Sequence, residues 1–299
     1  MSVVPFLSLS GAPGVTTLAC LVASTWAGQG PVAVVECDPS GGDLAARFGL
    51  TPAVGWSSLS AATRRTGPST PLAAHLQPLP GGLPVLVGTH EGAPVPAHAP
   101  AAGVVRAGFS HDAPPGVAIV DLGRALPGPV DPDGWLGAAD YAVLVVGDDP
   151  SAALRVRGRA SELLERTGGR LGLVVVGGTT YRCQELAEFT GIAALCDIPF
   201  DPQGAAVASG ASSAGRRLER SRLLASARRL GDGIAARTGA PGAQPDPTDG
   251  TAEPLTEPLT ETRLEPAPVS GGARSPMASL LSSMRPTGRR SRALVDGAI

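Results

Sequence analysis

Short runs of Val, Ile, Leu and Ala alternate with helical patterns over about the first 235 residues, and this alternation restricts the possible folds most strongly. The runs are continuously apolar, which is typical of strands buried on both faces of a parallel sheet. The sequence therefore predicts an α/β domain with a doubly wound, mostly parallel sheet flanked by helices. The predicted strands are residues 3–9, 32–37, 84–87, 117–121, 141–146, 171–176 and 194–198, and the predicted helices are residues 16–27, 42–48, 56–65, 151–167, 182–190 and 216–237.

The composition changes near Gly239. The remaining chain is rich in Pro and Gly and contains the short repeat AEPLTEPLTET. Such a segment buries too little apolar surface to offset its loss of conformational entropy. We therefore expect a folded domain over residues 1–239 and a Pro-rich disordered tail over residues 240–299. A short amphipathic segment near 277–284 could dock on a protein or a membrane, although an ordinary frayed tail is the favoured interpretation.

The charged residues exclude several kinds of chemistry. All 24 basic residues are Arg, so a lysine Schiff base or a P-loop lysine is impossible. The net charge of −2 argues against binding to nucleic acid through bulk charge alone. The four histidines lack the spacing of metal ligands, and the four cysteines form no CxxC pair, which indicates reduced thiols. The Lys-free composition, rich in Gly, Ala, Arg and Pro, suggests a GC-rich bacterial source. We expect a cytoplasmic protein, because the cysteines indicate reduced thiols and neither a signal peptide nor a long apolar run is present.

The first predicted strand runs directly into the turn SGAPGVTT, residues 10–17, and a predicted helix follows. A strand, a glycine-containing turn and a helix N-terminus form the architecture of a phosphate-binding loop, because backbone N–H groups and the helix dipole converge on an anion there. A hydroxyl at Thr16 or Thr17 stands where a Mg²⁺ ligand is needed. A loop of this pattern also occurs by chance, so it carries little weight alone.

Further motifs follow in register: ECDPSGGD around Asp38, AIVDLG around Asp121, then ADYAVLVV, DPSAAL and CDIPFD. In this order the chain resembles the ParA/MinD family of deviant Walker-A P-loop ATPases over about residues 1–237. The resemblance implies ATP or ADP with Mg²⁺ as cofactor. It implies a nucleotide-binding set of Gly11, Ala12, Pro13, Gly14, Val15, Thr16, Thr17 and Pro199, an inherited catalytic pair of Asp38 and Asp121, and a Mg²⁺ site of Thr16, Asp38 and Asp121, partly through water.

Each acidic residue also has a structural interpretation. Asp38 stands in the turn sequence DPSGG, where Asp is favoured in any case. Asp121 could simply cap the loop that follows its strand. We favour an inherited site, because both carboxylates stand at the positions that match the family.

The chain departs from the family pattern in three places. Ser10 replaces the lysine that reaches across the family's dimer, and Val15 replaces the lysine that contacts the β- and γ-phosphates. Loss of a charge-assisted contact weakens phosphate binding by about 1.5–3 kcal/mol, and phosphoryl transfer suffers more. We therefore expect slow or absent hydrolysis. Residues 176–180 lack the Asn that reads adenine in the family, so the base preference is open, with ATP as the default.

Two functions fit these residues, and a third does not. The first is a nucleotide-binding positioning or partition protein, most similar to the CpaE/TadZ branch that serves pilus and secretion machinery, with a homodimer and such components as partners. The second is a nucleotide-free scaffold, a pseudo-ATPase that keeps the fold for protein interaction. The third, an active partition ATPase, needs lysines that the chain does not have.

The predicted helix 216–237 carries seven arginines. It could add weak contact with DNA or an anionic membrane, as the tail could, which would place the protein peripherally at the inner face of the membrane. Its favoured role is to close the fold with its leucines, while the Arg side chains stay in water.

Overall fold

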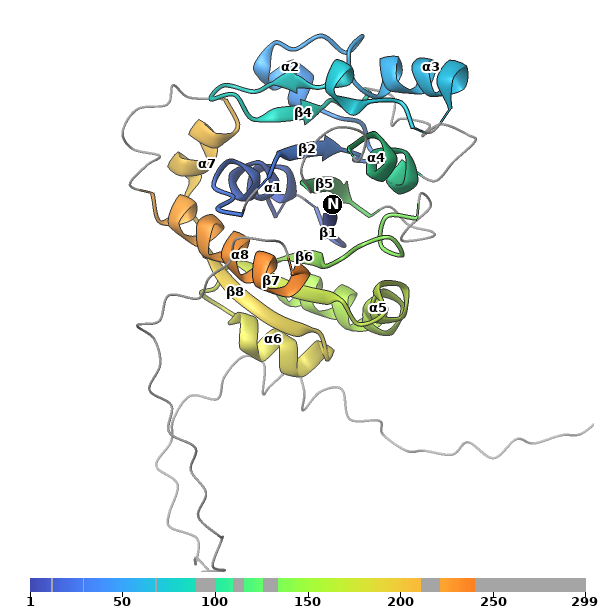
Figure 1. Ribbon diagram of the computed structural model, residues 1–299. Coiled ribbons are helices and arrows are strands. Elements are labelled where there is room, and N and C mark those ends of the chain that lie inside the picture. Colours follow the sequence, from blue (N-terminus) through green and yellow to red (C-terminus); the bar gives the residue numbers. More distant parts are fainter. Residues whose placement is uncertain are drawn as a thin grey trace, which may run out of the picture. The chain divides into compact units, whose positions relative to one another are not determined.

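The computed structural model describes residues 1–11, 13–28, 30–67, 69–89, 101–109, 116–125, 134–210 and 221–239 (Figure 1). Its sheet has eight strands in the order β3-β4-β2-β5-β1-β6-β7-β8. The strands are β1 (Ser2–Ser8), β2 (Val32–Glu36), β3 (Gln77–Pro78), β4 (Pro84–Leu86), β5 (Val117–Arg124), β6 (Ala142–Gly147), β7 (Leu171–Gly177) and β8 (Ala193–Pro199). The helices are α1 (Val15–Ser24), α2 (Leu44–Phe48), α3 (Trp56–Thr66), the 3-10 turn η1 (Leu72–His75), α4 (Ala101–Phe109), α5 (Pro150–Thr167), α6 (Cys183–Thr190), α7 (Pro202–Ala208) and α8 (Arg222–Thr238).

All paired strands are parallel except the short edge pair of β3 and β4. β1 lies at the centre between β5 and β6, and the chain leaves it toward β2 on the far side of β5. In such a sheet the carboxyl ends of the strands form a crevice where the winding reverses, and ligands bind there. The predicted fold class, a doubly wound sheet of the P-loop NTPase type, is confirmed.

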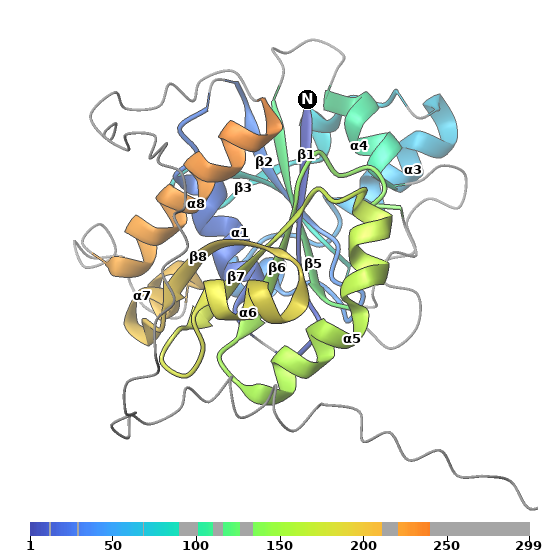
Figure 2. The same cartoon turned by 90° about the horizontal axis from the view of Figure 1, so that it is seen from below.

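Helices cover both faces of the sheet (Figure 2). α1 and α8 pack together on one face, and α5 and α6 pack together on the other. The strands are buried on both faces because their Val, Leu, Ile and Ala side chains point alternately into two helical layers. Val4, Phe6, Val34, Ile119 and Val143 lie in the core under α1 and are 0% exposed.

Helix starts follow local capping chemistry where the sequence offers an acceptor. Asp149 accepts a hydrogen bond from the N–H of Ala152 at the start of α5, and Asp201 accepts one from Gly204 at the start of α7. Ser221 accepts one from Leu224 and fixes the start of α8. An oxygen acceptor at the N-cap satisfies one of the free N–H groups of the first turn.

Two predicted boundaries were wrong in ways that affect the site. β5 continues past Asp121 to Arg124, because an irregularity in its pairing with β1 lets Ser8 pair with Arg124. The predicted helix 216–237 begins only at Arg222, since Ser221 has an extended backbone and serves as the cap. Residues 216–220 lie outside the described part of the chain.

Four short elements were not predicted: β3, η1, α4 and α7. Each is short, and Gly or Pro within or beside it hides its pattern. The remaining predicted elements are present, with each end displaced by at most three residues. The predicted tail, residues 240–299 with its segment 277–284, lies outside the described residues. In the described ranges, no helix combines the length and the apolar character that a membrane span requires.

Candidate nucleotide site at the carboxyl edge of the sheet

A cavity of about 470 Å³ opens at the carboxyl ends of β1, β2 and β5. This volume is in the range of small-molecule sites. Residues of three loops line it: Ser8, Gly11, Pro13, Gly14, Val15, Thr16, Thr17, Asp38, Ser40, Asp43, Arg47, Gly123 and Arg124. Residues 11 and 13–17 of the predicted phosphate loop therefore meet Asp38 and the end of β5 around one space. Ala12 lies outside the described residues.

The loop after β1 is shaped by backbone geometry. Gly14 has φ of +90°, a conformation that L side chains rarely adopt, and its carbonyl accepts the first helical hydrogen bond, from the Leu18 N–H at 2.9 Å. The buried Ser8 hydroxyl bonds to both the N–H and the carbonyl of Ser10, at 3.2 and 2.8 Å. Among the described residues, no side chain caps the start of α1. Its first N–H groups thus remain available for an anion.

Val15 has two roles at the first position of α1. Its side chain is only 5% exposed and packs in the core with Phe6 and Leu18, yet it also forms part of the cavity wall. A lysine at this position in relatives would place an ammonium group there, whereas Val15 contributes apolar surface. Position 15 therefore adds apolar surface and no charge to the cavity.

Asp121 is completely buried behind the wall that Thr16 and Gly123 form, and it does not itself line the cavity. Its Oδ1 accepts a hydrogen bond from the Gly123 N–H at 2.9 Å, while no described residue donates a hydrogen bond to its Oδ2. Burial raises the pKa of the Asp121 carboxyl to about 7, although the nearby Thr16 hydroxyl and the Gly123 N–H act to lower it. A buried carboxylate oxygen without a donor is the kind of group that a cation can satisfy.

Asp38 lies beside Asp121 at the end of the neighbouring strand, because Glu36 pairs with Asp121 in the parallel register. Its Oδ1 accepts the N–H of Ser40 at 2.7 Å, which forms a tight Asx-type turn. Desolvation raises the pKa of Asp38, and the Ser40 hydrogen bonds and the Arg124 charge only partly offset this effect. The turn interpretation and the inherited-site interpretation of Asp38 are therefore compatible.

Glu36 organises the loop that carries Asp38, and sequence reasoning missed this role. The side chain is 1% exposed. Its Oε1 accepts the N–H groups of Asp43 and Leu44 at 2.8 and 2.9 Å, and its Oε2 accepts that of Gly88 at 2.7 Å. Burial raises the pKa of Glu36, and these three hydrogen bonds counteract the rise. One signal was available: a carboxylate within an otherwise apolar strand, VAVVE.

A second cavity of about 340 Å³ adjoins the loop on its other side. The ends of β7 and β8 form its apolar wall with Val176, Ile198, Pro199 and Phe200, and Phe200 is 77% exposed. Gly11, Pro13 and Gly14 line both cavities. Pro199, predicted from the resemblance, is thus near the loop, as a residue beside a base would be.

Asp148, directly after β6, holds the loop that follows β7. Its Oδ2 accepts hydrogen bonds from the N–H and hydroxyl of Thr179 and the N–H of Thr180 at 2.6–2.8 Å, and its Oδ1 accepts the Tyr181 N–H at 2.6 Å. Partial burial raises the pKa of Asp148, but these hydrogen bonds outweigh it and the net pKa is lowered. The loop after β7 is therefore tied to β6, a contact that the sequence did not reveal.

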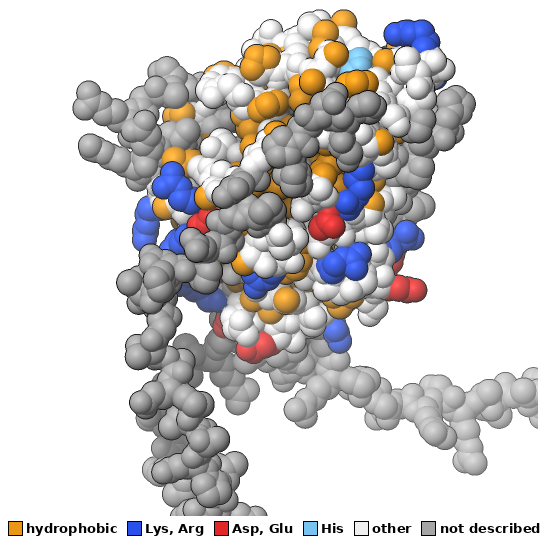
Figure 3. All heavy atoms as spheres, in the orientation of Figure 1, with side chains coloured by type: hydrophobic (Ala, Val, Ile, Leu, Met, Phe, Trp, Pro, Cys, Tyr) orange, Lys and Arg blue, Asp and Glu red, His pale blue; other side chains and the backbone are white. Residues whose placement is uncertain are grey.

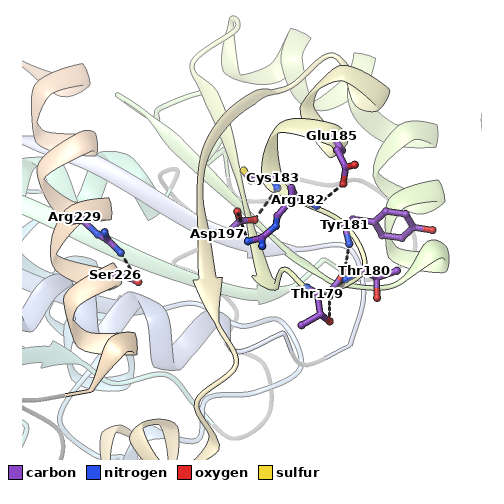
Figure 4. A network of polar contacts seen from close by, with 10 residues as sticks. Thr179, Thr180, Tyr181, Arg182, Cys183, Glu185, Asp197, Ser226 and Arg229 are labelled. Carbon is purple, nitrogen blue, oxygen red and sulfur yellow. Dashed lines mark hydrogen bonds and ion pairs between the residues drawn. The ribbon is translucent and has the colours of Figure 1, made fainter. Parts of the chain in front are cut away.

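The same loop continues into a polar cluster at the start of α6 (Figure 4). Asp197 of β8 accepts the N–H of Cys183 at 2.8 Å and lies 3.5 Å from the Arg182 guanidinium. Glu185 caps the start of α6, because its Oε2 accepts a hydrogen bond from the Arg182 N–H at 2.9 Å. These contacts hold α6 against the sheet. The neighbouring Cys183 is buried, as is Cys20, whereas Cys37 and Cys196 are half-buried, and all four are free thiols.

The described residues contain no group of three or more His, Cys, Asp or Glu side chains arranged to hold a metal ion. A P-loop Mg²⁺ site would not give such a group, because Mg²⁺ keeps several waters and takes one or two carboxylates beside phosphate oxygens. Thr16, Asp38 and Asp121 fit that sparse donor set.

No protein-family model and no curated protein sequence matches the chain. Solved structures do match it. A ParA family ATPase from Chlorobium tepidum has 18% identity, with 77% of this chain and 98% of that chain covered, at a TM-score of 0.58. The fold is that of the ParA and MinD ATPases.

Two MinD structures match similarly. MinD in the MinC:MinD cell division complex of Aquifex aeolicus has 16% identity, with 79% and 96% of the two chains covered and a TM-score of 0.58. The MinD protein of Pyrococcus horikoshii, solved with Mg-ADP, has 14% identity, with 78% and 95% covered and a TM-score of 0.57. At these identities the likeness is one of fold.

Proposed function

We propose that this chain binds ATP or ADP with Mg²⁺ in the 470 Å³ cavity and acts as a ParA/MinD-type positioning or partition protein. The observation that carries the proposal is the combination of an uncapped start of α1 and a left-handed Gly14 at the cavity with a buried Asp121 behind its wall, in contact with Thr16 and Gly123. The backbone N–H groups would hold phosphate oxygens, and the Thr16 hydroxyl and Asp121 would face the metal. Bound Mg²⁺ would neutralise phosphate charge.

We propose that the chain hydrolyses ATP slowly or not at all. Ser10 and Val15 supply no charge to a developing phosphoryl transition state, and the chain has no lysine elsewhere to replace them. Asp38 lines the cavity and Asp121 is buried behind its wall, so the proposal keeps both as inherited positions for the water and the metal.

The second cavity supports a base site. Its wall of Pro199, Phe200 and Val176 offers apolar surface to the flat face of a purine. Because Asp148 holds the loop of Thr179 and Thr180, base selection would depend on stacking more than on a reading side chain. ATP remains the default nucleotide.

The similarity to MinD also supports a protein partner for this chain. The MinD of Aquifex aeolicus was solved with MinC, which supports a protein partner for this chain too. We propose a homodimer across the nucleotide face, and a component of a pilus or secretion machine as partner, as in the CpaE/TadZ branch.

Contact of α8 with DNA or an anionic membrane is a weaker proposal. Leu223, Ala227, Leu230 and Ile234 of this helix are buried against the fold. On the face that Figure 3 shows, basic side chains are interspersed with acidic and apolar ones and form no continuous basic surface. This favours the closing role of the helix.

The test is calorimetric titration of Mg·ATP and Mg·ADP into the full chain and into Val15→Lys, with Val15→Ala as a control that loses the same packing without adding charge. Micromolar binding by the native chain supports the proposal. The second candidate is a nucleotide-free scaffold, which the core packing of Val15 favours. No binding by the native chain, together with binding by Val15→Lys, would support the nucleotide-free scaffold instead.

A further inference from the structure

Arg124 is brought to the phosphate loop by the extension of β5. Ser8, at the end of β1, pairs with Arg124, and the Ala125 N–H donates to the Ser8 carbonyl at 2.8 Å. Ser8 in turn bonds to Ser10 of the loop. The backbone of Arg124 is thus held beside the loop by regular strand pairing.

The Arg124 side chain faces the space above the loop. Its Nη1 lies 3.8 Å from the place that a β-carbon on Gly11 would occupy. The residue lines the 470 Å³ cavity and also a neighbouring cavity of about 630 Å³ that contains Arg155. Its side chain is exposed, and within the described ranges it has no hydrogen bond or ion pair.

The other cation at the 470 Å³ cavity is Arg47, and it is differently placed. Its guanidinium is paired with Asp43 on the same helical turn of α2. A guanidinium already neutralised by a carboxylate adds little net field at the cavity. Arg124 has no such ion pair among the described residues, although its charge also acts on the nearby Asp38 carboxyl, so it is the cation at this cavity that can turn to a ligand.

The geometry points to Arg124 as the phosphate-binding cation that compensates for the missing lysines, an inference that rests on the proposed nucleotide function. A guanidinium is always charged and its planar fork matches phosphate oxygens, so it can bind two of them at once. It approaches from the end of β5, whereas a lysine at position 15 would approach from α1. This arrangement allows binding of a polyphosphate while leaving hydrolysis slow.

The experiment uses the full chain, with Mg·ATP, Mg·tripolyphosphate and adenosine as probes in calorimetry. Arg124→Gln should weaken Mg·ATP and Mg·tripolyphosphate about tenfold to a hundredfold and leave adenosine unchanged, because only a phosphate contact is lost. Arg124→Lys should keep part of the affinity. Arg155→Gln is the matched control: it removes the same charge from the adjoining cavity and should change each affinity less than about twofold.

The outcomes separate the two proposals. Native binding of Mg·ATP with equal binding by Arg124→Gln would overturn the role of Arg124 and leave the proposed function standing. Absence of Mg·ATP binding by the native chain would overturn both. Equal weakening by Arg124→Gln and Arg155→Gln would reduce the effect to general charge and also overturn the specific contact. Thermal melting of each variant verifies folding, which the exposed and unpaired side chain of Arg124 should leave intact.

Discussion

The Asp38 side chain lies directly against the backbone of Gly123, so that a β-carbon on Gly123 would overlap Asp38 Oδ2. The two residues are neighbours because β2 and β5 are parallel and in register, with Glu36 opposite Asp121. Gly123 also has φ of +54°, in the left-handed region. The wall of the candidate site thus requires a glycine for both space and backbone conformation.

Gly123→Ala should therefore destabilise the protein by more than backbone strain alone, which costs about 1–3 kcal/mol. Gly81→Ala is the control, because Gly81 has φ of +91° but open space around its Cα. The free energy of unfolding, measured in urea, should fall further in Gly123→Ala. Equal losses in the two variants would show that the contact with Asp38 has no energetic weight.

Removal of the Glu36 carboxylate should loosen two loops at once. Glu36→Ala leaves the buried N–H groups of Asp43, Leu44 and Gly88 without an acceptor, and each such group costs about 1–3 kcal/mol. We expect a loss of about 3 kcal/mol or more in urea unfolding, and faster hydrogen exchange at the Leu44 and Gly88 amides. Glu165→Ala, on the exposed side of α5, should change neither quantity. Unchanged exchange at both amides would contradict the anchoring role.

Asp121 should make the metal-free protein less stable as the pH rises. Its pKa in the folded state, about 7, lies above the value near 4 of an unfolded aspartate, so its contribution to stability is complete below about pH 4 and is lost as the pH rises through 7. Between pH 5 and 8 the free energy of unfolding should fall by an amount on the order of a few kcal/mol. Asp121→Asn should flatten this dependence, whereas Asp232→Asn, at an exposed position of α8, should not. A parallel decline in native and Asp121→Asn protein would assign the effect to other groups.

Asp148 should have the opposite effect on the pH dependence of stability, because it stabilises the fold only when it is ionised. Hydrogen bonds from Thr179, Thr180 and Tyr181 lower its pKa, so its stabilisation is present above the unfolded pKa and disappears as the pH falls through the folded one. Asp148→Asn should cost about 1 kcal/mol at pH 7 and nearly nothing near pH 2. Urea unfolding at a series of pH values measures this, with Glu188→Gln of α6 as the control. A cost that stays constant with pH would show that charge has no part in holding the loop.

Local sequence patterns determined the fold class and the position of the glycine turn between β1 and α1, the predicted phosphate loop. Continuous apolar runs have one stable arrangement, a sheet buried on both faces, and a glycine turn between such a strand and a helix leads the chain across the sheet edge. The sequence alone also shows that the chain has no lysine and that Val15 stands where the family has one. These features depend on neighbouring residues, so periodicity and spacing show them.

The tertiary structure alone decided which distant groups complete the site. Glu36 reaches Gly88, Asp148 reaches Tyr181, and Arg124 reaches the loop after β1 through an irregular pairing with Ser8. Each contact joins residues far apart in the chain, and each depends on strand order and register. Strand order and register are set by the packing of the whole sheet, because the sequence of one strand does not determine which strand pairs with it. The sequence shows that the loop has no lysine, whereas only the fold shows that Arg124 lies beside the loop.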